Sequence, residues 1–369
     1  MNNAVAENTR KNWIDAAKGY GIILVMLGHI TEYSPVGMII YSFHMPLFFF
    51  LSGYLFSTKR SFGEFARKKT RRLIVPYFAY AIPLILWDVF AVKGRSYWQY
   101  APVFDGAKLL SLDSYGGTYN WSDVESQETI SIFLRDILGM VIQKRMWAHW
   151  YLACMILLCF LSYFLIKYIK QEWLRLSVVM VLTAGGFLFY IVGGKAWVWN
   201  ADVCFIALSF FYAGYLSRKY RVIEKTINIT NPIYILIAAI TLNLLFCGLN
   251  IKITGYGLDM YGCDYGVIPI MYLAAFSGTA AVVMIGYLYG IRYIRWVGRH
   301  SMVFFIFHQV VCIPMFEGLL SKLGILQNEG VVTESVHSLI ILVLTCAALS
   351  GVVCLLEMVL AQIKIACLT

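Results

Sequence analysis

The chain consists of long apolar runs separated by short polar stretches. A helix needs about 20 mostly apolar residues to cross a bilayer, and ten runs approach that length. They cover residues 13–31, 37–57, 73–92, 147–167, 175–194, 201–217, 232–249, 266–290, 301–321 and 335–360. The pattern predicts an all-α fold, a polytopic membrane bundle of about ten transmembrane helices.

Composition supports a membrane protein, because 60% of the residues are hydrophobic and only 14% are charged. Soluble domains carry about 45 to 50% apolar and about 25% charged residues. Disordered chains, coiled coils and nucleic-acid-binding modules are excluded on the same grounds. We therefore expect membrane lipid as a partner and no nucleic acid, and the sequence does not determine the oligomeric state.

The basic residues predict the orientation of the bundle. The chain has 30 Lys and Arg against 20 Asp and Glu, for a net charge of +10. Most of these cations fall in the segments that face inward when the N-terminus is inside, as membrane proteins prefer. We expect both termini in the cytoplasm and one integral membrane domain over residues 1–369. A long outer loop is expected at 93–146, with a short interfacial helix at 130–142.

Ionisable residues concentrate in the first two apolar runs. Lys18 and His29 are 11 residues apart, so three helical turns place them on nearly the same face with a rise of ~16 Å. Asp15 precedes Lys18 by one turn, a spacing that favours an ion pair. His44 enters the second run from the outer side, near the expected depth of His29. Such residues mark a functional site or an internal ion pair.

Further candidates lie near the ends of later runs and in the second run. They are Ser52, Tyr54, His149, Trp150, Trp199, Asp202 and His308. Trp and Tyr at these ends are also typical of an interfacial aromatic belt, and His308 suits either a packed or a functional role. The nine cysteines show no metal-ligand spacing, so we expect no metal.

A basic run at 59–72 includes Arg71 and Arg72. Guanidinium groups bind phosphates well, so this run is a candidate site for an anionic cytosolic cofactor. Anchoring on the inner surface and contact with anionic lipid explain the same residues equally well.

Several of these stretches resemble the membrane acyltransferase family three, integral enzymes that acylate bacterial envelope glycans. The likeness is clearest in WIDAAKGYGIILVMLGH, FHMPLFFFLSGYLF and RRLIVPYF, with weaker echoes in HWYL, WNADVCFIALSFFYAGY and GRHSMVFFIFH. The family pattern of a basic residue, ten intervening positions and a histidine falls on Lys18 and His29. Many members have arginine where this chain has Lys18, and lysine lacks the forked contact of arginine.

The resemblance implies an O-acyltransferase that uses acetyl-CoA from the cytosol and acylates a sugar hydroxyl at the bacterial inner membrane. His29 is then the expected general base or transient acyl carrier, and Lys18 binds or neutralises donor charge. His44 orients the acceptor or shares protons. The expected contacts to substrate come from Ser52, Tyr54, His149, Trp150, Trp199, Asp202 and His308, and those to the donor phosphates from Arg71 and Arg72.

Two other functions fit the residues. A transporter or flippase for a glycan or small molecule also uses many spans with intramembrane charges. A membrane glycosyltransferase is a third possibility, although the short outer loop at 32–36 offers only Glu32 as an acidic residue.

Overall fold

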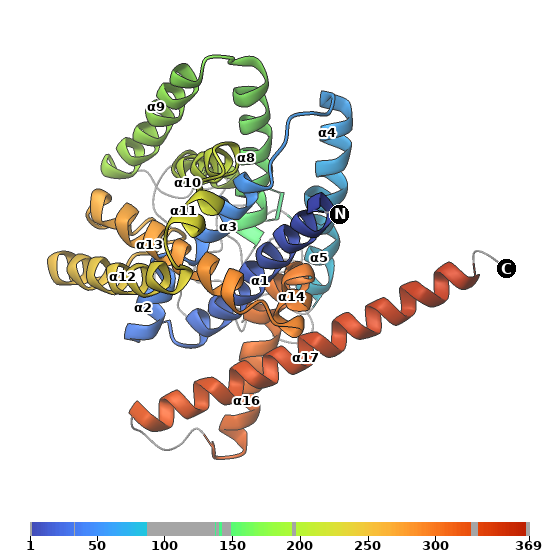
Figure 1. Cartoon of the computed structure of the whole chain (residues 1–369). Helices are drawn as coiled ribbons and strands as arrows, with labels where there is room; N and C mark the ends of the chain where they lie inside the picture. The colour runs from blue at the N-terminus through green and yellow to red at the C-terminus, as the bar shows by residue number, and fades with distance from the viewer. Residues whose placement is uncertain are drawn as a thin grey trace. The chain divides into compact units, whose positions relative to one another are not determined.

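The computed structural model describes residues 2–32, 34–86, 137, 140–141, 149–193, 197–325 and 331–366 (Figure 1). The secondary structure of these residues is helical, apart from one isolated antiparallel bridge between Asp259 and Asp264. The chain divides into two compact units. The first unit comprises Met1–Phe48, Ile227–Leu258 and Gly266–Thr369, and the second comprises Phe49–Thr226 and Asp259–Tyr265.

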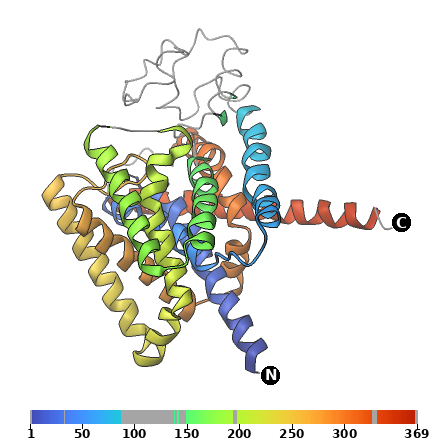
Figure 2. The same cartoon turned by 90° about the horizontal axis from the view of Figure 1, so that it is seen from above.

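The first unit is built around α1, which packs against α13, α14 and α2, while α12 lies along α13 in both views (Figure 2). Its helices are α1 (Asn2–Ile30), α2 (Pro35–Tyr41), α12 (Pro232–Thr254), α13 (Ile268–Leu288), α14 (Arg292–Arg299), α15 (Ser301–Phe307), the π-helical turn η5 (His308–Cys312), α16 (Ile313–Lys322) and α17 (Val331–Ala366). Helix α3 (His44–Tyr54) begins in this unit.

The second unit places α10 against α8 and α9, and these three helices lie side by side in both views (Figures 1 and 2). Its elements are α4 (Phe62–Lys69), the π-helical turn η1 (Thr70–Ile74), α5 (Val75–Leu86), α8 (His149–Tyr168), α9 (Glu172–Ile191), the short 3₁₀ turn η4 (Val198–Asn200), α10 (Ala201–Lys219) and the first part of α11 (Val222–Ile229).

Seven helical segments among the described residues are long and apolar enough to cross a membrane. They are Pro35–Tyr54, His149–Tyr168, Glu172–Ile191, Pro232–Thr254, Ile268–Leu288, Ser301–Lys322 and Glu334–Val359. Each coincides with a predicted run, so the all-α, multi-pass membrane architecture is confirmed. The other three predicted runs overlap α1, α5 and α10, for which membrane crossing stays a prediction, as does the orientation of the termini.

The predicted outer loop at 93–146 lies outside the described residues, apart from Ile137, Met140 and Val141. These three residues are helical and belong to the stretch expected to form an interfacial helix.

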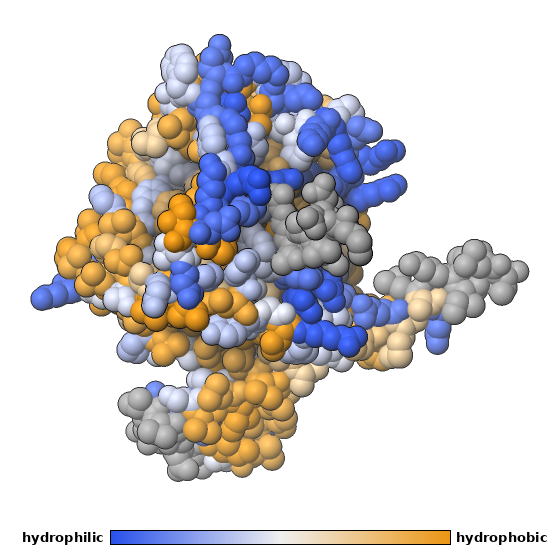
Figure 3. Space-filling view, viewed as in Figure 1, coloured by the Kyte–Doolittle hydropathy of each residue, from blue (hydrophilic) through white to orange (hydrophobic). Residues whose placement is uncertain are grey.

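Large apolar side chains remain exposed on the outward faces of several helices. On α12 they include Ile237, Leu244 and Leu245, and Figure 3 shows apolar surface over α12 and α13. Soluble proteins rarely expose contiguous apolar surface of this kind, whereas a bilayer solvates it. Hydrophilic residues gather instead over α4 and over the connection between α8 and α9 (Figure 3).

Paired glycines allow helices to approach closely within each unit. In the first unit, a Cβ on Gly298 would lie 1.8 Å from the backbone oxygen of Asp15, and a Cβ on Gly19 would lie 2.0 Å from that of Ile294. Helices α1 and α14 therefore cross with their backbones in contact. Small residues have this role in membrane proteins, where close packing takes over from hydrophobic collapse.

A similar pair joins α3 and α10 in the second unit. A Cβ on Gly53 would lie 1.8 Å from the oxygen of Phe211, and a Cβ on Gly214 would lie 2.0 Å from that of Phe50. These contacts fix the position of residues 51–54 (LSGY) against α10.

Both π-helical turns are followed by a proline two residues after their last residue. In η1 the Val75 amide donates to the Thr70 oxygen, and Pro76 follows. In η5 the Ile313 amide donates to the His308 oxygen, and Pro314 follows. Proline has no amide proton and its ring clashes with the carbonyl four residues earlier, so widening the preceding turn relieves the clash.

Candidate active site

His29 lies near the end of α1 and is held by the tyrosine that ends α2. The Tyr41 hydroxyl is 2.8 Å from His29 Nδ1, and the two rings meet edge to face with centroids 5.6 Å apart. The Ser34 amide donates to the Thr31 oxygen at 2.9 Å, and the Ser34 side chain caps α2 by accepting from the Gly37 amide, so α2 begins close to the end of α1. This geometry brings Tyr41 back onto His29.

A second imidazole, that of His308, packs against His29. Their ring centroids are 5.1 Å apart, with an interplanar angle of 42°. His308 is fully buried, and its Nδ1 is 2.9 Å from the Phe304 oxygen. Its Nε2 has no hydrogen-bond partner among the described residues.

His44 completes the group at the start of α3. Its ring centroid is 4.8 Å from that of Tyr41, and its Nδ1 is 3.1 Å from the Ile40 oxygen. The structure thus brings His29, Tyr41, His44 and His308 together from α1, α2, α3 and η5 of one unit. We call these four residues the histidine cluster. Imidazole can act as base, acid or nucleophile near neutral pH, so the cluster is suited to acyl and proton transfer.

Lys18 lies on α1 with its partner Asp15, as the spacing predicts. Asp15 interacts electrostatically with Lys18, and also with Arg299 and Arg295 of α14. The Lys18 side chain is partly buried. Three cations, one from α1 and two from α14, thus interact with a single carboxylate, and the local charge is positive.

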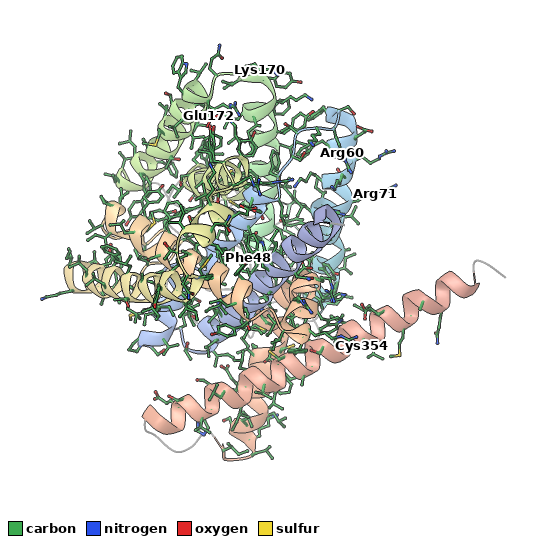
Figure 4. The ribbon with its side chains drawn as sticks, viewed as in Figure 1. Phe48, Arg60, Arg71, Lys170, Glu172 and Cys354 are labelled. Carbon is green, nitrogen blue, oxygen red and sulfur yellow. The ribbon has the colours of Figure 1, made fainter. Side chains whose placement is uncertain are left out.

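Arg71 and Arg72 lie in η1 of the second unit, and both are exposed. Figure 4 labels Arg71 and Arg60, which belong to one basic stretch over residues 59–72. Burial lowers the pKa of Lys68, and the nearby cations Arg72, Arg60 and Lys69 lower it further. Mutual repulsion of this kind identifies a surface at which a bound anion would be stabilising.

Helix α8 holds the start of this basic stretch in place. The Tyr163 hydroxyl donates to the Arg60 oxygen at 3.0 Å, and Lys167 Nζ donates to the Thr58 oxygen at 3.2 Å. Lys69 turns inward, where its Nζ donates to Cys159 Sγ at 3.1 Å and lies over the ring of Phe56. The exposed cations thus project from a fixed segment.

Helix α4, which carries part of the stretch, has a capping box at its start. Ser61 Oγ accepts from the Glu64 amide, and the Glu64 carboxylate accepts from the Ser61 amide at 3.1 Å. Hydrogen bonds from Ser61 lower the pKa of Glu64. Helix α4 therefore begins at a defined residue, which fixes where its basic side chains lie along the helix.

Ser52 and Tyr54 form structural contacts within the second unit. Ser52 hydrogen-bonds to Tyr151. The buried Tyr54 donates to Glu224 Oε1 at 3.2 Å, and its backbone oxygen accepts from Arg218 Nη1 at 3.3 Å. Neither residue belongs to the unit that holds the histidine cluster.

Three predicted substrate contacts lie elsewhere in the second unit. The buried ring of His149 lies 5.5 Å from that of Tyr77, on which Trp199 stacks at 5.7 Å. Trp150 packs against Tyr261 with centroids 5.8 Å apart.

Asp202 is buried at the start of α10. Its Oδ1 accepts from the Trp197 amide at 3.3 Å, and its Oδ2 is 3.6 Å from Cys263 Sγ. Both carboxylate oxygens of Asp202 thus have a protein contact that holds the group in place.

Sequence reasoning missed Tyr41, because it lies inside an apolar run in which a tyrosine carries no special signal. The available hint was its position three residues before His44. No group of His, Cys, Asp and Glu that could hold a metal ion is present among the described residues.

Comparison with known proteins gives three findings. Residues 11–356 match the family described as an acyltransferase domain, acyltransferase family three. A stretch of 83 residues is 37% identical to the nodulation protein NolL of Mesorhizobium japonicum, and the match covers 19% of this chain and 22% of that protein. No solved structure matches the chain.

Proposed function

The chain belongs to acyltransferase family three, and from this premise we propose that it transfers an acetyl group from cytosolic acetyl-CoA to a hydroxyl of a cell-envelope or exported glycan, in the bacterial inner membrane. The observation that carries the proposal is the histidine cluster. Three imidazoles and a tyrosine from four elements meet in a buried setting, where charged groups are costly and therefore mark a function.

His29 is the residue to which we assign the central chemistry. Its imidazole either removes the proton of the acceptor hydroxyl or carries the acyl group for part of the cycle. Tyr41 fixes the orientation of the ring through Nδ1. The Nε2 atom is the one left for chemistry.

The basic stretch supplies the donor site in this proposal. Acetyl-CoA carries phosphates, and Arg71 and Arg72 are exposed guanidinium groups on a segment that its neighbours hold in place. Lys18 provides further positive charge along α1, the helix that carries His29.

The aromatic groups around Trp150, Trp199 and His149 suit a glycan acceptor, because sugars stack on aromatic faces and hydrogen-bond to their polar edges. Trp199 Nε1 donates to the Val141 oxygen at 3.0 Å, so its ring orientation is fixed. Asp202 contributes a buried carboxylate near the start of α10, the helix that follows the η4 turn containing Trp199.

The decisive experiment compares His29→Ala with the wild type. Purified protein and native membranes receive radiolabelled acetyl-CoA, and alkali-labile acetate in the envelope fraction is measured. We expect the variant to lose transfer by about 100-fold or more. Undiminished transfer by His29→Ala would remove His29 from the mechanism.

A matched control is His337→Ala on α17, a partly buried histidine outside the cluster. It should transfer acetate at the wild-type rate. The same assay separates the enzyme from a transporter, because a transporter would move a glycan without consuming acetyl-CoA.

A further inference from the structure

We propose that His308 is a second catalytic residue, which takes the proton of the acceptor hydroxyl while His29 carries the acyl group. The inference rests on the proposed function and assigns separate tasks to the two imidazoles. Three observations support it: the hydrogen bonding of His308, its burial, and its contact with His29.

The hydrogen bond to Phe304 fixes the tautomer of His308. A backbone carbonyl can only accept, so the Nδ1 atom at 2.9 Å from the Phe304 oxygen carries the proton. In the neutral ring, Nε2 is then a lone-pair acceptor. His308 is therefore set up as a base at Nε2 without any rearrangement.

This lone pair has no partner among the described residues, although His308 is fully buried. Buried polar atoms nearly always find hydrogen bonds, and an exception calls for an explanation. A hydroxyl group of a bound substrate is the donor that such an atom lacks. His44 has the same tautomer, because its Nδ1 is bonded to the Ile40 oxygen, but its ring packs on Tyr41, whereas the ring of His308 packs directly on His29.

His308 also lies where the acyl group would be handed over. Its ring centroid is 5.1 Å from that of His29, whose Nδ1 is engaged by Tyr41. It is the first residue of the π-helical turn η5, and such turns occur often at functional sites. Pro314 follows this turn and favours its widening, so the sequence itself favours the backbone conformation that begins at His308.

The chemistry balances in two steps. First, His29 Nε2 attacks the thioester carbon, the N–C bond forms and the C–S bond breaks, leaving an acyl-imidazolium and the CoA thiolate. Second, the acceptor oxygen attacks the acyl carbon while its proton passes to His308 Nε2, and the C–N bond to His29 breaks. His308 then returns the proton to the thiolate, which gives the ester and CoA thiol.

The test separates the two steps with His308→Asn. Asparagine keeps an N–H that can reach the Phe304 oxygen but has no basic nitrogen in the place of Nε2. Purified protein without acceptor is assayed for label exchange between acetyl-CoA and free CoA, which needs only His29. Native membranes are assayed for alkali-labile acetate, which needs both residues.

We expect His308→Asn to retain exchange within about threefold and to lose transfer by about 100-fold, as removal of a general base does. His29→Ala should lose both activities. Wild-type transfer by His308→Asn, or a parallel loss of exchange and transfer in a folded variant, would overturn the assignment. A wild-type protein that shows neither activity would overturn the proposed function itself.

His300→Asn is the matched control. His300 Nδ1 is also bonded to a carbonyl four residues earlier, at 2.9 Å from the Trp296 oxygen, but its Nε2 is paired with Glu357 at 3.0 Å. This variant should keep both activities. A transfer defect in His300→Asn equal to that of His308→Asn would show that the loss is structural.

Discussion

At the scale of single residues, the Tyr41 hydroxyl controls how His29 presents its imidazole. The 2.8 Å contact to Nδ1 orients the ring and leaves Nε2 for chemistry. We predict that Tyr41→Phe lowers kcat roughly tenfold, the value of one buried hydrogen bond, with little change in KM for acetyl-CoA. Steady-state kinetics of radiolabelled transfer would measure both constants.

Tyr20→Phe is the control for this prediction. The Tyr20 hydroxyl donates to the Tyr289 oxygen at 2.7 Å, so the variant loses a comparable bond on the same helix, away from the cluster. Its kcat should match the wild type. An equal fall in both variants would mean that α1 tolerates no lost hydrogen bond, and Tyr41 would have no special role.

Lys18 supports a second prediction at this scale. If its charge attracts the donor, Lys18→Arg retains more activity than Lys18→Ala, and the loss in Lys18→Ala is mainly a rise in KM for acetyl-CoA, roughly tenfold at the strength of a partly buried charge contact. Lys252→Ala, at an exposed lysine of α12, serves as control. Equal loss in both Lys18 variants would show that charge alone is not what matters.

The candidate residues were predictable where they break the apolar pattern, and hidden where they do not. Lys18, His29, His44 and His308 are polar groups in apolar runs, so hydropathy alone draws attention to them. Tyr41 gives no such signal. The pairing of His29 with His308 depends on a tertiary contact between distant segments, which run lengths in a single sequence do not encode.

At the scale of helices, the α1–α14 crossing depends on having no side chain at Gly298. We predict that Gly298→Ala destabilises the protein by about 1 to 3 kcal/mol, the usual result of overpacking, because the added carbon meets the Asp15 carbonyl at 1.8 Å. This exceeds the gain in helix propensity of about 1 kcal/mol. Thermal unfolding of detergent-solubilised protein would measure the difference.

Gly185→Ala in α9 is the matched control, because nothing lies within 4 Å of its added Cβ. It should be neutral or slightly stabilising. If Gly298→Ala is as stable as Gly185→Ala, the close approach of α1 and α14 is not required for folding.

Helix positions follow the apolar runs closely, because in a membrane the length of a run determines the length of a helix. The run at 232–249, for example, becomes α12 (Pro232–Thr254). The two π-helical turns were not predicted, although Pro76 and Pro314 are visible in the sequence. A proline indicates that a helix must adjust, but the surrounding packing determines whether it kinks, ends or widens.

At the scale of the whole molecule, the predicted topology and the proposed donor together predict a sided reaction. The basic stretch at 59–72 belongs to a segment predicted to face the cytoplasm, and acetyl-CoA does not cross a bilayer. We predict that inverted vesicles, with the cytoplasmic face outward, use added acetyl-CoA at once. Right-side-out vesicles should reach less than about a tenth of that rate until they are permeabilised, since charged groups cross hydrocarbon at high cost.

Sealed vesicles of both orientations, each measured before and after permeabilisation, provide the comparison. Arg71→Ala with Arg72→Ala should raise KM for acetyl-CoA in inverted vesicles and leave the sidedness unchanged, because the loss of phosphate contacts does not reorient the bundle. Lys252→Ala again provides the control for removal of a cation. Equal use of acetyl-CoA by both sealed orientations would contradict the predicted topology, and an unchanged KM in the double variant would assign the basic stretch to lipid anchoring.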